Sequence, residues 1–177
     1  GLFLADTYFF TANTATSSIL TRAHKAMLDY VETQWQQRQE DLPLNSPYDA
    51  LILASIIEKE TAVSAERTKI AGVFVNRLRK NMRLQTDPTV IYGIGDTYDG
   101  NITRKHLRTP TPYNTYTIKG LPPTPIAMAG KDAIWAALNP METDALYFVA
   151  RGDGSHEFSS SLAAHNAAVR KYQLNRK

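Results

Sequence analysis

Cysteine is absent from the 177 residues of this chain. Its absence excludes a disulfide framework, a thiol nucleophile and a thiolate metal site. The chain also has no run that approaches the ~20 apolar residues of a membrane span. Neither a glycine-rich nucleotide-binding motif nor a G-x-S-x-G nucleophile elbow occurs in it. A Ser–His–Asp triad of another design is not excluded by composition.

Charge of one sign is also scarce. Lys and Arg number 20 and Asp and Glu number 17, so the formal net charge is +3. This excess is too small to indicate a nucleic-acid partner. The four histidines are scattered and lack the helical spacing of a zinc motif, so we expect neither a metal nor a cofactor. The chain starts at Gly1 without Met, as an excised fragment would, so we expect that targeting or anchoring sequence has been removed.

The first half of the chain reads as helices after a short extended start. The aromatic stretch Leu2–Phe10 is strand-like. Apolar residues at spacings of three and four predict a helix over Ser18–Arg38. After a break at Pro43–Pro47, a second helix opens at Tyr48 or Asp49 and is apolar nearly all round, which is typical of a buried helix. A third helix is expected from about Ser64 to Leu78.

The second half mixes loops, short helices and a hairpin. Asp87 with Pro88 reads as a helix N-cap and first helical residue, and Thr103 can cap another short turn. Residues 109–125 lack periodicity and predict a long loop, followed by a helix over Lys131–Leu138.

Further along, two strands, a glycine-rich turn and a closing helix are expected. These are Ala145–Ala150, Gly152–Gly154, His156–Ser159 and Leu162–Tyr172. The chain is therefore expected to form one helix-rich α+β domain over residues 1–177, with a short C-terminal β-hairpin.

Two carboxylates, Glu58 and Glu60, stand at the end of the most apolar helix. An apolar wall removes hydration from a carboxyl and raises its pKa, which is how a glutamate becomes a general acid. Residues two apart on a helix point to different sides, so the two are not a cooperating pair. Periodicity slightly favours Glu60. Most glutamates at helix ends do no chemistry, however, so the residues alone favour both being solvated or paired with Lys59, Arg67 or Lys69.

Two further segments carry polar groups that could bind sugars. Gln85 and Asp87 flank a helix entry, although Asp87 could serve only as its cap. The loop that contains Asn114 and Tyr116 offers an amide for hydroxyl groups and a ring face for a pyranose. A proline-stiffened surface loop is an equally good explanation of that segment. A basic run at the end of the third helix, comprising Arg77, Arg79, Lys80 and Arg83, is interpreted as a solvated face.

Taken together, these segments resemble the YceG-like family of endolytic murein transglycosylases over essentially the whole chain. The matching stretches are Leu51–Thr61, Val75–Leu78, Met82–Gly93, Tyr113–Tyr116, Gly120–Pro123, Pro125–Ile126, Tyr147–Val149 and His165–Asn166. The match from Gln85 to Gly93 is highly specific. One local departure is Thr124, which stands where many relatives have glycine.

The resemblance implies an enzyme that cleaves nascent peptidoglycan glycan strands internally and terminates their elongation. It places the essential catalytic glutamate at Glu60. It further implies peptidoglycan synthases as partners, no nucleic-acid partner, and a full-length protein anchored in the inner membrane by one span. This catalytic domain would then lie in the periplasm, without the anchor and the small LysM-like module that precede it in the family. Substrate-binding residues are expected at Glu58, Gln85, Asp87, Asn114 and Tyr116.

The chemistry implied is lytic transglycosylation without water. Glu60 would protonate the oxygen of the MurNAc–GlcNAc β-1,4 bond, the muramyl 6-hydroxyl would attack, and the same glutamate would take its proton. One carboxyl then suffices, whereas a hydrolase normally needs two at ~5–9.5 Å separation, for which Asp87 or Glu66 could supply the second. A muramidase, a catalytically silent glycan-binding scaffold and a nucleic-acid binder remain as rival hypotheses.

Overall fold

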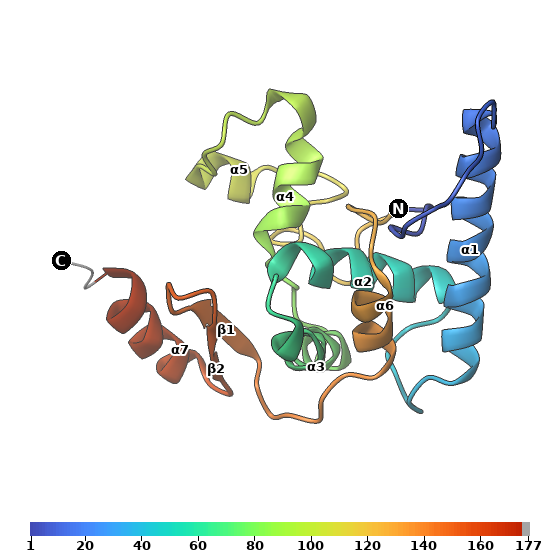
Figure 1. The fold of residues 1–177 in the computed structure, drawn as a ribbon. Helices are drawn as coiled ribbons and strands as arrows, with labels where there is room; N and C mark the ends of the chain where they lie inside the picture. Colours follow the sequence, from blue (N-terminus) through green and yellow to red (C-terminus); the bar gives the residue numbers. More distant parts are fainter. Residues whose placement is uncertain (175–177) are drawn as a thin grey trace.

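The fold is a group of helices with a small hairpin at one end (Figure 1). The computed structural model describes residues 1–174. The helices within this range are α1 (Thr16–Gln36), α2 (Pro47–Glu60), α3 (Arg67–Arg79), α4 (Asp87–Ile94), α5 (Arg104–Arg108), α6 (Lys131–Leu138) and α7 (Leu162–Val169). The strands are β1 (Tyr147–Ala150) and β2 (His156–Ser159). Shorter turns are η1 (Ser64–Glu66), η2 (Gly95–Thr97) and the π-helical η3 (Arg170–Leu174). The predicted α+β class is confirmed.

Helix α2 is the centre of the core. Every residue from Ala50 to Ile57 is buried, so this helix is apolar on all sides and must be surrounded. Ser46 caps its start by accepting a hydrogen bond from the Asp49 amide at 3.2 Å, and Pro47 occupies the first turn. Proline fits there because the first amides of a helix have no intrahelical partner. The helix therefore begins slightly earlier than the sequence predicts.

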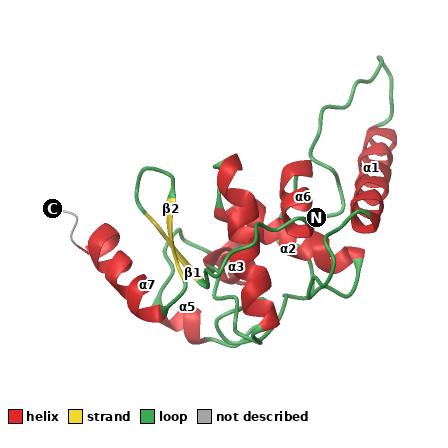
Figure 2. Ribbon diagram, turned by 90° about the horizontal axis from the view of Figure 1, so that it is seen from below, coloured by secondary structure: helices red, strands yellow, loops and turns green. Residues whose placement is uncertain are grey.

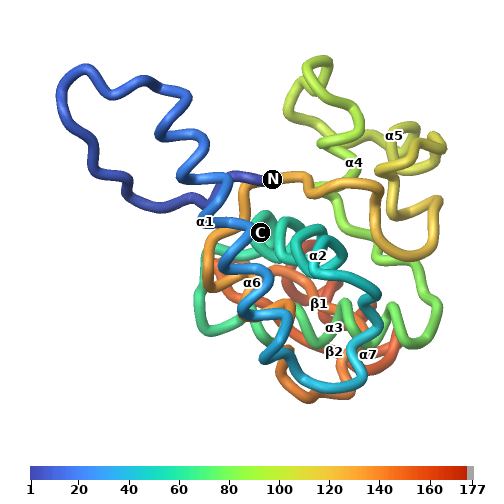
Figure 3. The backbone as a smooth tube through the Cα atoms, turned by 90° about the vertical axis from the view of Figure 1, so that its right-hand side faces the viewer, coloured from blue at the N-terminus to red at the C-terminus, as the bar shows by residue number. Residues whose placement is uncertain are grey.

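The other elements are arranged around α2 (Figure 1). Helices α3 and α6 lie along one side of it, and α4 rises from the opposite side. Helix α1 stands at one end of the molecule, while the hairpin and α7 stand at the other, which is also evident in the view of Figure 2. Figure 3 shows that the N-terminal loop and the α4–α5 region project from the same side of this core as two separate lobes. The C-terminal end of α2 thus lies on the side of the hairpin, far from α1.

The N-terminal segment is not a strand, which corrects the prediction for Leu2–Phe10. The amide of Leu4 donates to the Ala23 carbonyl at 3.1 Å, and the Tyr8 hydroxyl donates to the Leu4 carbonyl at 2.9 Å. These bonds fasten the segment to α1 and to itself, whereas a strand requires a neighbouring strand for its backbone groups. The high aromatic content of this segment was therefore not sufficient to predict a strand.

Two predicted helix caps had different outcomes. Thr103 does cap α5: its hydroxyl accepts from the His106 amide at 3.2 Å, and the His106 Nδ1 accepts from the Thr103 amide at 3.3 Å. Asp87 is not the cap of α4, because Thr86 holds that position and Asp87 is already helical. The Asp87 carboxylate instead accepts a hydrogen bond from Tyr116. The predicted loop over residues 109–125 contains no helix or strand.

The C-terminal hairpin is confirmed, with Phe148 paired opposite Phe158 in an antiparallel register. Gly152 and Gly154 adopt positive φ angles of 98° and 92° in its turn, a conformation that glycine accepts without steric cost. Phe148 packs edge-on against Phe74 of α3, with ring centroids 5.8 Å apart. The predicted closing helix ends at Val169 and continues as the π turn η3. This packing carries the hairpin to the end of α2.

No helix within residues 1–174 is long and apolar enough to cross a membrane.

A buried hydroxyl on α2 gives a first prediction. Ser55 is fully buried, donates to the Ile52 carbonyl at 2.7 Å and accepts from the Ile126 amide at 2.9 Å. Ser55→Ala leaves that amide without a partner, so we expect a loss of about 1–3 kcal/mol of unfolding free energy in urea titrations. The exposed control Ser160→Ala should change it by less than about 0.5 kcal/mol. Equal stabilities of the two variants would contradict this account.

Candidate active site

Glu60 lies where the buried helix α2 reaches the surface. It is the last residue of the helix and is partly exposed, whereas Ile56 and Ile57 are completely buried. Its carboxylate accepts a short hydrogen bond from the hydroxyl of Thr86, which is itself buried. Burial of the carboxyl raises the pKa of Glu60, and the neighbouring charge of Asp87 raises it further. The Thr86 hydrogen bond and the charge of Arg77 act in the opposite direction, but burial dominates.

Arg77 on α3 forms the floor beside this carboxyl. It is only 7% exposed. Its guanidinium donates from Nε to the Leu146 carbonyl at 2.6 Å and from Nη1 to the carbonyls of Arg83 and Leu84 at 3.2 and 2.8 Å. The interpretation of the basic run as a solvated face is therefore wrong for Arg77. Its fork of donors joins the strand region to the segment that carries Gln85.

Asp87 and Tyr116 form a pair on the adjacent rim. The Tyr116 hydroxyl donates to Asp87 Oδ1 at 2.5 Å. Burial and this hydrogen bond raise the pKa of Tyr116 well above its ordinary value, so the phenol keeps its proton and remains a donor. The pair links the start of α4 to the long loop.

The long loop is held to the segment before α4 by backbone and hydroxyl groups. The Gln85 amide donates to the Thr115 carbonyl at 3.1 Å, and the Thr86 amide donates to the Thr115 hydroxyl at 3.0 Å. Gln85 itself has a φ of 51°, a left-handed conformation that is uncommon for a residue other than glycine. Such local strain is concentrated at functional sites and needs surrounding contacts to maintain it.

The opposite wall comes from the hairpin and α7. Tyr147 stacks on His165, with ring centroids 5.2 Å apart and planes inclined by 24°. The Arg77 guanidinium lies 5.1 Å from the Tyr147 ring centroid. His156, the first residue of β2, binds Glu66. Burial lowers the pKa of His165, and the charge of Arg77 lowers it further.

These walls enclose a cleft of about 530 Å³ with Glu60 in its lining. It is lined by the end of α2, by Arg77, by the Leu84–Asp87 segment, by Tyr116 and by the hairpin with α7. Stacked aromatic rings, a buried cation and a carboxyl of raised pKa converge there. This combination makes the cleft the candidate active site, with Glu60 as its candidate general acid. Within residues 1–174, no group of three metal-ligating side chains is placed to hold a metal ion.

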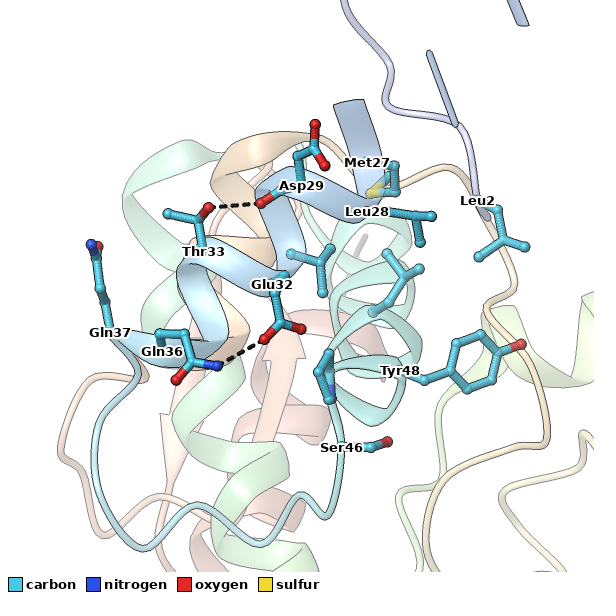
Figure 4. Close-up of a pocket in the computed structure, with 13 residues that line it drawn as sticks. Leu2, Met27, Leu28, Asp29, Glu32, Thr33, Gln36, Gln37, Ser46 and Tyr48 are labelled. Carbon is cyan, nitrogen blue, oxygen red and sulfur yellow. Dashed lines mark hydrogen bonds between the residues drawn. The ribbon is translucent and has the colours of Figure 1, made fainter. Parts of the chain in front are cut away.

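A larger hollow of about 1020 Å³ lies between α1 and the start of α2 (Figure 4). Its wall is largely aliphatic, and the Glu32 carboxylate within it already accepts a hydrogen bond from Gln36 at 2.7 Å. Tyr48 in this hollow and Glu60 stand about 18 Å apart along the helix axis at ~1.5 Å per residue. The larger volume alone would favour the hollow as the active site, but the titratable groups of raised or lowered pKa favour the cleft that contains Glu60.

The comparisons with known proteins agree with this geometry. The model of the YceG-like family matches residues 1–171. The chain belongs to the YceG-like family. An endolytic murein transglycosylase of Bacillus subtilis (strain 168) is 43% identical over 171 residues, which cover 97% of this chain and 47% of that protein. One from Streptococcus pneumoniae serotype 2 (strain D39) is 32% identical over 178 residues, with 97% and 32% covered.

A solved structure shares the fold. The crystal structure of a YceG-like protein from Listeria monocytogenes superposes with a TM-score of 0.78 at 39% identity and covers 94% of this chain and 53% of that one. The YceG-like chain thus spans less than half the length of the two curated relatives it matches.

Three of the five predicted binding residues lie in the cleft of this YceG-like domain with Glu60: Gln85, Asp87 and Tyr116. Glu58 does not. Its carboxylate accepts from the Gly130 amide at 3.0 Å and lies 3.8 Å from Arg67, around the helix from Glu60. Pairing with Arg67 was the alternative that the sequence left open for it.

Asn114 lies beneath the cleft wall rather than in it. It is 1% exposed, and its amide donates to the carbonyls of His106, Leu107 and Thr109 while its oxygen accepts from the Tyr116 amide. These bonds shape the loop that carries Tyr116. The structure thus places Asn114 as a loop organiser, and its predicted contact with sugar loses its geometric basis.

Sequence reasoning about chemistry missed four cleft residues: Arg77, Tyr147, His156 and His165. Tyr147 and His165 do stand in segments that carry the family resemblance, and this was the available signal. The histidines appeared scattered because they are separated from Glu60 by more than ninety residues of chain. Only the docking of the hairpin brings them to the end of α2.

The raised pKa of Glu60 has a consequence for stability in this YceG-like domain. Below the unfolded-state pKa of about 4.3 both states are protonated, and as pH rises towards the folded-state pKa only the folded state keeps the proton. Wild-type stability therefore falls over that window. Glu60→Gln lacks this titration, so we expect the stability difference in its favour to grow with pH in denaturant titrations.

The exposed Glu142→Gln is the matched control and should follow the wild type at every pH. A stability difference between wild type and Glu60→Gln that stays constant from about pH 4 to pH 9 would contradict the proposed burial of the carboxyl.

Arg77 provides a second stability prediction. Arg77→Lys keeps the charge but cannot span three carbonyl groups, so we expect the domain to lose about 2–3 kcal/mol in thermal or chemical unfolding. Arg83→Lys, at an exposed neighbour in the same basic run, should change stability by less than about 0.5 kcal/mol. Similar losses in both variants would refute the role of Arg77 as a buried connector.

Proposed function

We propose that this domain is the catalytic part of an endolytic peptidoglycan lytic transglycosylase. The observation that carries the proposal is Glu60: one carboxyl of raised pKa, at the end of a buried helix, in a cleft of aromatic and hydrogen-bonding groups. Both curated relatives described above bear the name endolytic murein transglycosylase. The substrate is then a nascent glycan strand, cut internally at the MurNAc–GlcNAc β-1,4 bond.

In the proposed reaction, Glu60 begins protonated and donates its proton to the glycosidic oxygen as the bond to the muramyl anomeric carbon breaks. Positive charge develops at that carbon, and the muramyl 6-hydroxyl attacks it. The ionised Glu60 takes the hydroxyl proton and returns to its first state. The products are a strand with a 1,6-anhydro-MurNAc end and a strand with a free GlcNAc 4-hydroxyl. The raised pKa supports the first step, and the Thr86 hydrogen bond stabilises the carboxylate between the two steps.

The other cleft residues serve substrate orientation in this proposal. Gln85 presents its amide at the rim, and Tyr116 with Asp87 offers a phenol and a carboxylate for sugar or peptide-stem groups. Hydrolysis by water would need a second carboxylate beside Glu60, and Asp87 is the candidate for it in the cleft. Its hydrogen bond to Tyr116 favours a binding role, which is why we prefer the transglycosylase to the muramidase.

The setting of the whole protein is part of the proposal. A substrate made outside the cytoplasm requires a catalytic domain in the periplasm, and we propose that the full-length protein is held in the inner membrane by a single span. Termination of strands during their synthesis further suggests peptidoglycan synthases as partners. The domain is proposed to need no cofactor.

The proposed function is tested by the products. We expect mass spectrometry of peptidoglycan digested with residues 1–177 to show 1,6-anhydro-ended glycans, and Glu60→Gln to reduce their rate of formation by about 10²–10⁴-fold. The exposed Glu142→Gln should retain full activity. Products with reducing ends would show that the domain is a muramidase rather than a transglycosylase. If neither this chain nor a longer version of the protein released soluble products, the domain would be interpreted as a glycan-binding scaffold.

A further inference from the structure

Glu66 and His156 form a pair that the proposed reaction does not use. Glu66 ends the η1 turn, six residues after Glu60, and His156 begins β2. The two carboxylate oxygens of Glu66 take two different groups of His156: Oε1 accepts from the backbone amide at 3.0 Å, and Oε2 lies 2.7 Å from the ring Nδ1. The side chains are 16% and 11% exposed. Both carboxylate oxygens of Glu66 are thus used to hold His156, and one of them orients its imidazole ring.

The ring of His156 is held from several sides and still reaches the cleft. Phe148 contacts it edge-on, with centroids 5.4 Å apart and planes at 88°, and Phe158 lies at 6.3 Å. His156 lines the same cleft as Glu60 and Arg77. A clamp for the hairpin alone would need only the backbone amide of residue 156. The additional bond to Nδ1 fixes the direction of the ring.

That bond also selects which ring nitrogen serves the cleft. A carboxylate cannot donate, so the Nδ1 that it binds carries a proton, and the other nitrogen of a neutral imidazole is then an acceptor. We propose that His156, fixed by Glu66 in the Nδ1–H form, is a substrate-binding residue whose Nε2 accepts a hydrogen bond from a glycan hydroxyl or amide N–H beside Glu60. This inference rests on the proposed function for its substrate class. Glu66 is then a positioning residue, because it acts only by orienting the ring of His156.

The first test is the tautomer, which is independent of activity. We expect long-range ¹H–¹⁵N spectra of the full chain at neutral pH to show Nδ1 protonated and Nε2 unprotonated at His156. His106 is an internal reference of the opposite kind, because its Nδ1 accepts from the Thr103 amide. An imidazolium or an Nε2–H ring at His156 would overturn the proposal.

Glu66→Gln sharpens this test. A glutamine oxygen can still accept from the His156 amide, but its NH₂ group then faces Nδ1 and favours the Nε2–H tautomer. We expect the tautomer to switch and glycan cleavage to fall by about 10- to 100-fold, the loss typical when the group that orients a ligand-binding histidine is removed. A switched tautomer with wild-type cleavage would show that the ring direction is irrelevant to function.

The second test separates the ring nitrogens by substitution. His156→Asn keeps a side-chain donor near the position of Nδ1 and has no counterpart of Nε2, whereas His156→Gln places an amide near the position of Nε2. In a Glu60→Gln background, where cleavage is slow enough for binding to be measured, we expect the Asn variant to bind soluble un-crosslinked glycan strands about 10-fold more weakly. The Gln variant should recover part of the loss. His24→Asn, on α1, is the control and should bind as its parent does.

The outcomes distinguish the inference from the proposed function. Strands that bind normally to the Asn variant, or that fail to bind even the Glu60→Gln parent, would overturn the role of His156. Weakened binding by the Asn variant, together with no anhydro products from the wild type, would support the glycan contact while the transglycosylase proposal fails. Backbone ¹H–¹⁵N spectra of each variant check that the hairpin is still folded, and if the Asn variant fails this check, the tautomer at His156 and the Glu66→Gln variant decide the proposal.

Discussion

Helix α2 must be buried on all sides, and the arrangement of the remaining elements follows from this constraint. An apolar helix without a solvated face has to be covered, and α1, α3, α4 and α6 supply the cover. The helix ends where the cover ends, and its last residue is a glutamate whose carboxyl is still desolvated. The raised pKa of Glu60 therefore originates in the burial of the helix that it ends.

The cleft itself depends on connections between segments distant in sequence. Arg77 joins the strand region to the Leu84–Gln85 segment through carbonyl groups, and Thr115 joins the long loop to the same segment. Glu66 joins the turn after α2 to β2. Each connection uses a charged or polar side chain in a position of low exposure, where an unpaired group would be costly. The walls of the cleft are thereby held at a defined distance from Glu60.

Much of the local structure could be read from the residues because local rules govern it. The helices of α2, α3 and α6 follow from apolar spacing, the Thr103 cap from a side-chain hydroxyl within reach of its own turn, and the hairpin from its glycines. The strand expected over Leu2–Phe10 failed because strands need partners, which a single segment does not reveal. The cap expected at Asp87 failed because Thr86 holds the N-cap position and Asp87 is already the first helical residue.

The sequence by itself determined that a glutamate would stand at the end of a buried helix, and its family resemblance selected Glu60 over Glu58. Only the tertiary structure decided which polar residues share the cleft with it. Asn114 and Arg77 show the reason: one was expected at the surface of a loop and is buried as its organiser, and the other was expected in solvent and is a buried connector. Burial and hydrogen-bond partners at such positions arise from contacts between segments far apart in the chain, and local spacing carries no record of them.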